Sequence, residues 1–354
     1  MRKRLSKKNT RERQYVVKLK DIAEVAGVSI GTVSKALSNS HEISLKMTKK
    51  IRKIAKEMGY IANSQARGLK TNRSYNIGVV YIDKSKAGLK HEYFSTMLSS
   101  IQETLRTKGY DFTFISNLVG TTKHTLLSHA RYRRCDGVII TTADYNDPEI
   151  LQLISSDMEV VTIDHEFPNK TAIMSDNNIG LGKIVEYVYK MGHKKIAFIH
   201  GEMTQVTKDR LKSFENMCEK LRINIPPEYV LQADYHLPRE SGLATRKLLD
   251  LNEKPTCIIY PDDYSFMGGM TEIEKHGLNI PDDISVVGYD GIYLSTILRP
   301  SLTTYVQNST EIGKQAALKL IEQIENPKDF VAKSIIISGK LQKGQTVKNI
   351  KSTF

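Results

Sequence analysis

The sequence contains no tryptophan, only three cysteines and no long hydrophobic run. No apolar segment approaches the roughly 20 residues that a membrane-spanning helix needs, and no apolar stretch follows the basic N-terminus as in a signal peptide. Cys135, Cys218 and Cys257 are far apart and lack metal-ligand spacing, so we expect buried, reduced thiols. These absences predict a cytoplasmic protein that contacts no membrane and needs no cofactor or metal.

Sequence motifs of the common enzyme classes are absent as well. The chain has no G-x-S-x-G or H-E-x-x-H motif, and its histidines show no pairing at ligand spacing. The segment Gly180-Leu-Gly-Lys183 lacks the spacing of a phosphate-binding loop and the Ser or Thr that should follow it. We therefore expect no catalytic activity.

Positive charge is concentrated at one end of the chain. The net charge is +13. Residues 1–74 contain 19 Lys and Arg but five Asp and Glu, whereas the other 280 residues contain 33 and 34. A basic segment attached to a nearly neutral body is typical of a protein that binds nucleic acid. A membrane-surface role is disfavoured because the segment lacks a basic helix with an aromatic and leucine face.

Residues 19–38 have the pattern of two short helices joined by a tight turn. Gly27 can adopt the left-handed conformation that ends the first helix, and Ser29 can cap the second. The inward faces of the two helices are apolar: Leu19, Ile22, Ala23 and Ala26, then Val33, Ala36 and Leu37. The outward face of the second helix is small, hydroxylic and cationic: Gly31, Thr32, Ser34 and Lys35. This pattern predicts a helix–turn–helix that inserts its second helix into the DNA major groove, although a helical hairpin with a solvated polar face would look similar.

The neighbouring segments extend this head. A third amphipathic helix is expected over residues 44–58, ending at Gly59. Residues 1–16 form a basic arm without periodicity, which we expect to be disordered and to serve either for phosphate contacts or for solubility. Residues 60–74 are a linker with one turn of helical pattern, starting at Asn63.

From residue 76 onward the pattern changes to alternating strands and helices. The expected strands are 77–82, 112–115, 137–141, 160–163, 195–199, 229–233, 257–260, 284–289 and 334–340. Amphipathic helices are expected between them, for example at 94–108, 180–191, 211–221 and 240–251. This alternation predicts an α/β body with two doubly wound parallel sheets.

Acidic residues follow three of the predicted strands, at the ends where open α/β sheets bind ligands. They are Asp164, Asp262 with Asp263, and Asp290. Their carboxylates can accept hydrogen bonds from sugar hydroxyls, while Arg210 can donate and an aromatic side chain can pack on the ring. Each aspartate taken alone could equally be a turn or cap residue.

The sequence resembles the lactose-repressor/galactose-repressor (LacI–GalR) family of transcription regulators over about residues 17–345. The match comprises Asp21-Ile22-Ala23, Ala26-Gly27-Val28-Ser29, Thr32-Val33-Ser34, and Pro281-Asp-Asp-Ile-Ser-Val-Val-Gly-Tyr-Asp290. The resemblance implies a three-helix DNA-binding head, a hinge and a two-lobed periplasmic-binding-protein-like effector domain. It also implies that the hinge folds on operator DNA and inserts Leu69 into the minor groove, where an apolar wedge and Arg67 would kink the duplex.

The resemblance and the local patterns together define the expected sites. The predicted DNA-binding residues are Ser29, Ile30, Gly31, Thr32, Ser34, Lys35, Tyr60, Asn63, Ala66, Arg67 and Leu69. Ile30 could instead pack inward with Val33. The predicted effector-binding residues are His91, Tyr93, Phe94, Asp164, Arg210, Asp262, Asp263 and Asp290. Where many family members have Asn-Pro-Phe-Phe, this chain has His91-Glu92-Tyr93-Phe94. The identity of the ligand therefore cannot be inferred from that of a relative.

The expected domains are an arm (1–16), a head (17–62), a hinge (63–74), a body (75–345) and a tail (346–354). Within the body we expect a first lobe of about 75–174 with 305–333, and a second of about 175–304 with 334–345. No leucine heptads follow, so nothing predicts a tetramerising tail. A homodimer is the expected minimum, because one three-helix head reads too few base pairs for useful specificity. The chain is predicted to be a transcription regulator, most simply a repressor of carbohydrate genes, that binds double-stranded operator DNA under control of a small sugar effector. Control by a phosphoprotein co-repressor and a solute-binding protein without a DNA role are the alternatives.

Overall fold

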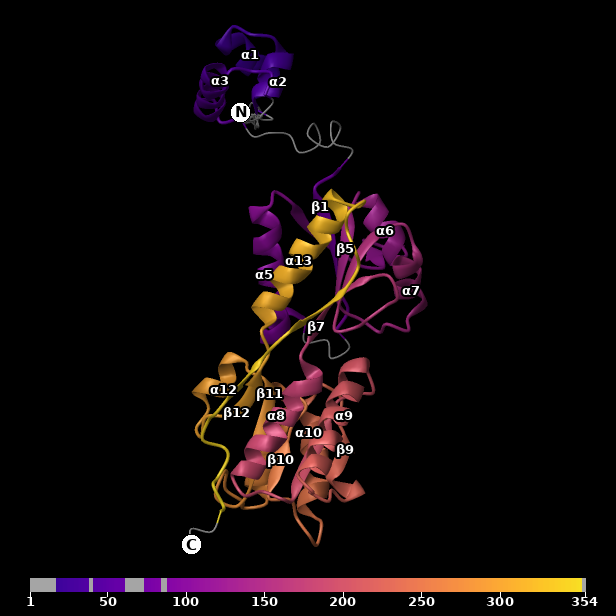
Figure 1. Ribbon diagram of the computed structural model, residues 1–354, viewed down its shortest axis with the longest axis vertical. Helices are drawn as coiled ribbons and strands as arrows, with labels where there is room; N and C mark the ends of the chain where they lie inside the picture. The colour runs from indigo at the N-terminus through magenta and orange to yellow at the C-terminus, as the bar shows by residue number, and fades with distance from the viewer. Residues whose placement is uncertain (1–16, 38–40, 61–72, 84–87, 352–354) are drawn as a thin grey trace, which may run out of the picture. The chain divides into compact units, whose positions relative to one another are not determined.

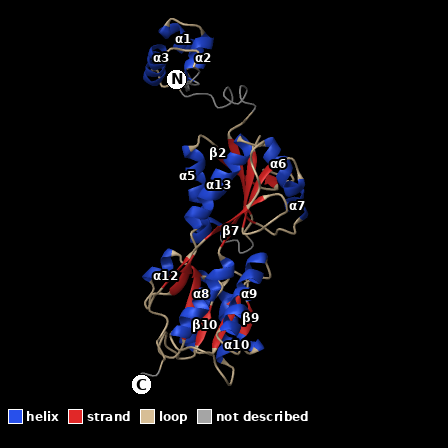
Figure 2. Ribbon diagram, viewed as in Figure 1, coloured by secondary structure: helices blue, strands red, loops and turns tan. Residues whose placement is uncertain are grey.

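The structure, a computed structural model, describes residues 17–37, 41–60, 73–83 and 88–351. It consists of two compact units, Met1–Ser74 and Tyr75–Phe354, shown as ribbons in Figure 1 and by secondary structure in Figure 2. We call the helical part of the first unit the head and the second unit the body.

The head contains three helices, α1 (Leu19–Ala26), α2 (Ile30–Leu37) and α3 (Leu45–Glu57). The expected caps are confirmed: Gly27 has a φ of 70°, and the Ser29 hydroxyl accepts a hydrogen bond from the Thr32 amide at 3.1 Å. One apolar core joins the three helices, and its buried members are Ile22, Ala23, Ala26, Val33, Ala36, Ile51 and Ala55. The first helix is also tied to the third, because the Lys50 ammonium donates to the Ala26 carbonyl.

The first lobe of the body is a six-stranded sheet in the order β13-β7-β6-β5-β1-β2, with every neighbouring pair parallel. The strands are β1 (Asn76–Tyr81), β2 (Asp111–Ile115), β5 (Gly137–Thr142), β6 (Glu159–Ile163), β7 (Thr171–Ser175) and β13 (Ser334–Ile337). Helices α5 (Glu92–Thr107) and α13 (Ser309–Glu325) cover one face. Helices α6 (Leu126–Tyr132) and α7 (Pro148–Ser155) cover the other. A short hairpin, β3 (Leu118–Val119) and β4 (Thr122–Lys123), follows β2.

The second lobe repeats this architecture with a sheet in the order β14-β12-β11-β10-β8-β9. Its strands are β8 (Ile196–His200), β9 (Val230–Gln232), β10 (Cys257–Ile259), β11 (Ser285–Asp290), β12 (Thr303–Val306) and β14 (Lys340–Gln342). Only the pair of β12 and β14 is antiparallel. Helices α8 (Asn177–Lys190) and α9 (Gln205–Lys220) cover one face, and α10 (Pro238–Leu249) and α11 (Asp263–Lys275) cover the other. A short helix, α12 (Tyr293–Ile297), precedes β12.

The chain passes between the lobes three times, after β7, after β12 and between β13 and β14. The third crossing corrects an expected boundary. Residues 334–337 were expected in the second lobe as part of one long strand, but Ile335 and Ile336 pair in parallel with β7 of the first lobe. Two short strands in different sheets therefore replace the single strand at 334–340, because the chain changes lobe at residues 338–339.

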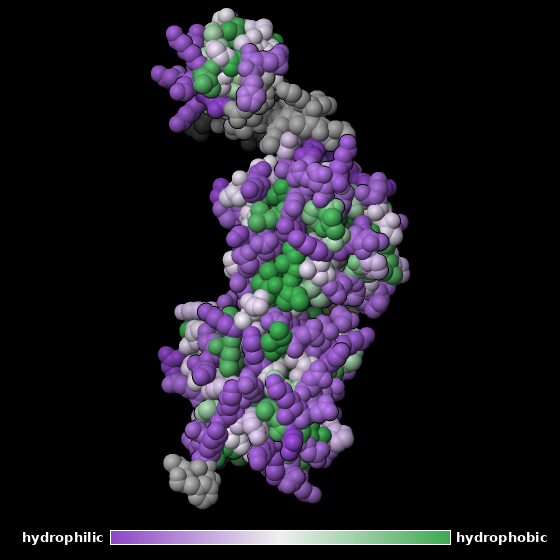
Figure 3. Space-filling model, viewed as in Figure 1, coloured by the Kyte–Doolittle hydropathy of each residue, from purple (hydrophilic) through white to green (hydrophobic). Residues whose placement is uncertain are grey.

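The body is a globular unit with a mostly hydrophilic surface. Its visible face is interrupted only by separate hydrophobic patches (Figure 3). All three cysteines are buried and unpaired, as expected. Within the described ranges, no helix has both the length and the apolarity needed to cross a bilayer.

Candidate functional site

The first candidate site is the outward surface of α2 in the head. Ser29, Ile30, Gly31 and Lys35 are exposed, and Thr32 and Ser34 are half-buried. Ile30 has 52% of its surface exposed and therefore does not pack inward with Val33, which is fully buried. The surface thus presents an apolar side chain and an ammonium, groups that suit contact with a thymine methyl and with guanine or phosphate, respectively.

Two contacts modify what this surface can offer. Lys35 forms an ion pair with Glu42, and both side chains are largely exposed. The Ser29 hydroxyl is already engaged in capping α2 and in a 2.9 Å hydrogen bond with the Thr32 hydroxyl.

Of the remaining predicted DNA-binding residues, Tyr60 packs against the apolar core of the head. The other predicted DNA contacts, Asn63, Ala66, Arg67 and Leu69, lie outside the described residues, as does the arm at 1–16.

The second candidate site is a cavity of about 470 Å³ between the two lobes of the body. The C-terminal ends of strands from both sheets and the segments just after them line it, including Ile82, Thr142 and Asp164 from the first lobe and Glu202 and Asp290 from the second. Of the eight predicted effector residues, five line the cavity: Tyr93, Phe94, Asp164, Arg210 and Asp290.

Arg210 is the most firmly positioned of these residues. It lies in the second turn of α9, with only 4% of its surface exposed. Its Nε donates to the Asn177 side-chain oxygen at 3.0 Å, and its Nη1 donates to the Pro261 carbonyl at 2.9 Å. The guanidinium also stacks on the Tyr289 ring. A buried cation held in this way offers its remaining N–H groups in a fixed direction.

Asp164 and Asp290 face the cavity from opposite lobes. The Asp164 carboxylate accepts hydrogen bonds from the Ser175 amide and hydroxyl at 2.5 and 2.9 Å, and burial raises its pKa. Asp290 accepts a hydrogen bond from the Gln307 amide at 2.6 Å, and burial, with a contribution from Asp262, raises its pKa to about 7. The φ angles of Asp164 and Asp290 are 55° and 103°. Such left-handed backbone is strained for residues with a side chain, and strain of this kind gathers at functional sites.

Aromatic side chains form part of the cavity wall. Tyr93 and Phe94 lie in the first turn of α5. The Phe94 ring packs edge-on against the Tyr81 ring, with 5.4 Å between the ring centres. Tyr145 and His165 also line the cavity, and their rings are stacked 4.2 Å apart. These flat surfaces are suited to packing against a sugar or another ring.

Three predicted effector residues are absent from the lining. Asp263 accepts hydrogen bonds from the Gly291 and Ile292 amides and the Thr304 hydroxyl, so it joins α11 to the segment just after β11 and to β12. Asp262 caps α11 through the Ser265 amide and hydroxyl. His91 is 5% exposed and packs against His236, with 3.8 Å between the ring centres.

The sequence reasoning also missed residues that line the cavity. Asp234, Tyr235 and His236 follow the predicted strand at 229–233, so the strand-end argument used for Asp164 and Asp290 could have found them. Gln307 follows β12, a strand that was not predicted, and therefore carried no such signal.

The charge of the described lining is predominantly negative. It contains six carboxylates (Asp83, Asp144, Asp164, Glu202, Asp234 and Asp290) and two permanent cations (Lys208 and Arg210). Like charges in a partly buried site repel, so this lining disfavours a phosphorylated ligand. It offers many acceptors and a few fixed donors, which is the arrangement needed to bind several hydroxyl groups.

Comparison with known proteins yields matches to both parts of the chain. Residues 18–63 match the family described as bacterial regulatory proteins, lacI family. Residues 185–347 match the periplasmic binding protein-like domain. The first match covers the head and the second covers most of the second lobe.

Individual relatives extend over nearly the whole chain. The HTH-type transcriptional repressor PurR of Haemophilus influenzae (strain PittEE) is 28% identical over 319 residues, covering 88% of this chain and 93% of the relative. A crystal structure of a putative transcriptional regulator LacI from Bacillus cereus subsp. cytotoxis is 28% identical, covers 78% of this chain and 99% of that one, and has a TM-score of 0.71. The lac repressor dimer bound to operator and the anti-inducer ONPF shares the fold, with 23% identity, 94% and 100% coverage and a TM-score of 0.76.

Proposed function

Because this chain belongs to the LacI/GalR family of transcription regulators, we propose that a small ligand in the cavity between its lobes controls its affinity for operator DNA. Its relatives are transcriptional repressors, so the chain is a DNA-binding repressor and not an enzyme. Both lobes contribute to the cavity wall, so a ligand that contacts both favours one degree of lobe closure over another. This preference shifts the population between two states of the body.

The observation that carries this proposal is the buried Arg210 at the edge of an acidic cavity. Removing a guanidinium from water is costly unless its N–H groups are satisfied. Two protein acceptors, the Asn177 side chain and the Pro261 carbonyl, hold it, and five N–H donors are present in a guanidinium. A ligand oxygen in the cavity is the natural acceptor for a further donor.

The ligand we propose is an uncharged, hydroxyl-rich molecule such as a sugar. Carboxylates of both lobes accept hydrogen bonds from its hydroxyl groups, Arg210 donates to one of its oxygens, and Phe94 offers an aromatic face. A planar heterocycle such as a nucleobase is the second ligand class, favoured by the stacked rings of Tyr145 and His165. A phosphoprotein co-repressor is less well supported, because it would leave these buried polar groups without a role.

The remaining parts of the proposal follow from the head. One three-helix head reads too few base pairs for useful specificity, so we propose a cytoplasmic homodimer that reads two half-sites. Ligand-dependent closure of the lobes then changes how the two heads are presented to the operator.

The test is a ligand screen followed by a DNA-binding measurement, both on the full chain. Thermal-shift assays would compare uncharged sugars, the same sugars as phosphates, and nucleobases. Fluorescence anisotropy would then measure each hit's effect on binding to a duplex selected from a random library. We expect stabilisation by an uncharged ligand and a changed operator affinity. Stabilisation by anionic ligands alone, or a bound ligand that leaves operator affinity unchanged, would contradict the proposal.

A further inference from the structure

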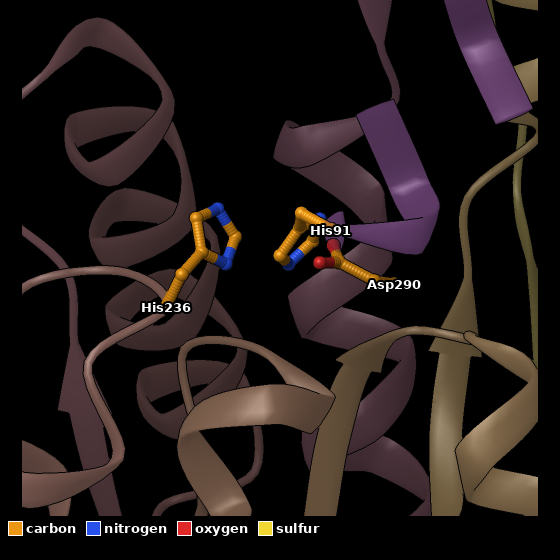
Figure 4. Close-up of side chains that lie close together, drawn as sticks. All are labelled: His91, His236 and Asp290. Carbon is orange, nitrogen blue, oxygen red and sulfur yellow. The ribbon is translucent and has the colours of Figure 1, made fainter. Parts of the chain in front are cut away.

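His91, His236 and Asp290 converge at the boundary between the two lobes. Figure 4 shows the three side chains pointing toward one another. Each offers one nitrogen or oxygen atom, and these three atoms all lie within 4.8 Å of one another. His91 precedes α5 in the first lobe, His236 lies between β9 and α10 in the second, and Asp290 ends β11. The cluster therefore joins the lobes.

The polar atoms of His91 are buried without a partner among the described residues. Only 5% of its surface is exposed, and both Nδ1 and Nε2 lack a hydrogen bond. Burying unpaired polar atoms costs free energy, and native structures rarely leave both nitrogens of one imidazole unsatisfied. His91 also precedes α5 without capping it through its side chain, so helix capping does not account for its position. A bound species that accepts a nitrogen lone pair would account for it.

The two other members are oriented by further contacts. The Asp262 carboxylate lies 3.4 Å from Nδ1 of His236 and accepts a hydrogen bond from the His236 amide at 3.0 Å. One Asp290 oxygen accepts the hydrogen bond from Gln307, which leaves the other available. The amide behind Asp290 is an outer contact of the kind that orients metal ligands in proteins. The Asp262 carboxylate lies where such a contact to His236 would be, although His236 Nδ1 makes no hydrogen bond among the described residues.

We propose that His91, His236 and Asp290 bind a divalent transition-metal ion, with Zn²⁺ as the probe, across the boundary between the lobes. Two imidazoles and one carboxylate suit such an ion, with the fourth position left to water, whereas Mg²⁺ and Ca²⁺ prefer oxygen ligands. Atoms that bind one Zn²⁺ at about 2.1 Å are at most about 4.2 Å apart, so small side-chain rotations complete the site.

The ion would link the two lobes, because its protein ligands come from both lobes. It therefore favours the arrangement of the lobes seen in this structure, independently of an organic ligand. The inference goes beyond the proposed ligand response and does not rest on it: Asp290 belongs to both sites, but Zn²⁺ binding is measured in the absence of any sugar.

The experiment uses the untagged full chain after removal of metals with a chelator. Competition with a chromophoric chelator gives the Zn²⁺ stoichiometry and affinity, and visible absorption of Co²⁺ reports the ligand set. We expect one Zn²⁺ per chain and no comparable binding of Mg²⁺. His91→Asn and His236→Gln should each weaken Zn²⁺ binding by at least about tenfold, the low end of the loss seen for even the outer contacts of metal sites. Asparagine is chosen at residue 91 because it is a favoured N-cap residue.

His41→Gln is the matched control, because His41 is exposed in the head and takes no part in the cluster. It should bind Zn²⁺ as the wild type does. The inference is overturned if the wild type binds no Zn²⁺, if both cluster variants retain wild-type affinity, or if His41→Gln loses as much as they do. A sugar-responsive protein that binds no Zn²⁺ refutes only this inference, and a Zn²⁺-binding protein that responds to no ligand refutes only the proposed function.

Discussion

The guanidinium carbon of Arg210 lies 3.6 Å from the ring centre of Tyr289, the residue that precedes Asp290 in β11. The stack, together with the hydrogen bonds to Asn177 and Pro261, joins α8, α9 and β11 around one buried cation. Arginine is suited to this position because its planar group can stack and donate at once, which a lysine ammonium cannot do. The ligand surface that we propose in the second lobe is therefore built on a contact between two side chains from distant parts of the chain.

Arg210→Lys should separate ligand binding from DNA binding. The variant keeps the positive charge but loses the planar stack and a directed donor, worth about 1.5–3 kcal/mol for a hydrogen bond to a charged group. Ligand affinity should fall by about ten- to a hundredfold, measured by calorimetry, while operator affinity without ligand stays within a few fold. Arg106→Lys, on the exposed surface of α5, is the control. Equal ligand affinity in the two variants would contradict the assignment of Arg210.

The ion pair between Lys35 and Glu42 predicts opposite effects of two substitutions in the head. Lys35→Ala should cost about 1–3 kcal/mol on the cognate duplex and relax one base position if Lys35 reads a guanine. Glu42→Gln should strengthen DNA binding, because it removes an acceptor that competes for Lys35 and a negative charge near the phosphates. Anisotropy at several salt concentrations measures both. Uniform weakening of Lys35→Ala on all sequences would assign Lys35 to a phosphate.

The hinge prediction comes from the sequence alone, because Leu69 lies outside the described residues. An apolar wedge acts only on kinked DNA, whereas phosphate contacts of the head persist on any duplex. Leu69→Ser should therefore lower the ratio of specific to non-specific affinity and reduce DNA bending. Gel phasing measures the bend, and an unchanged bend angle would rule out insertion of Leu69.

Gly180 is packed against the tyrosines behind Arg210. A Cβ at this position would lie 2.4 Å from the Tyr289 hydroxyl and 2.8 Å from the Tyr305 ring. Gly180→Ala should destabilise the body by about 1–3 kcal/mol, the usual cost of overpacking, and weaken ligand binding by displacing Tyr289. Gly182→Ala on the same helix is the control, since its nearest contact would be 3.3 Å. Urea unfolding should show the larger loss for Gly180→Ala; equal losses would contradict this packing argument.

Glu272 predicts a pH dependence of stability. Arg246 on α10 and Lys275 on α11 hydrogen-bond its carboxylate at 2.9 and 2.8 Å and lower its pKa from 4.5 to about 2. A lowered folded-state pKa stabilises the fold above pH 4.5, and this contribution is lost as the pH falls toward 2. The stability difference between wild type and Glu272→Gln, from urea unfolding, should therefore be constant above pH 5 and shrink below pH 4.5. A difference that does not change with pH would contradict the pairing.

Local chemistry determined the parts of this protein that the sequence predicts well. The left-handed Gly27, the capping Ser29 and the apolar faces of the head depend on residues a few positions apart, so the helix–turn–helix could be predicted from the sequence. Buried parallel strands such as β5 and β8 contain runs of apolar residues, which can be recognised without knowing which strands lie beside them. The positive charge of the first 74 residues is likewise a property of composition.

Tertiary packing determined the features that the sequence did not predict. The strands β7 and β12 contain several Thr and Ser residues and were missed, because their burial comes from the sheets that receive them. Asp263 and Asp290 look alike in the sequence, yet Asp263 is held by the backbone amides of Gly291 and Ile292, just after β11, whereas Asp290 lines the cavity. Likewise, His91 and His236 are 145 positions apart in the sequence, and their rings meet because two lobes pack together. Contacts between distant segments depend on how sheets and lobes are arranged, and a local sequence pattern carries no information about that arrangement.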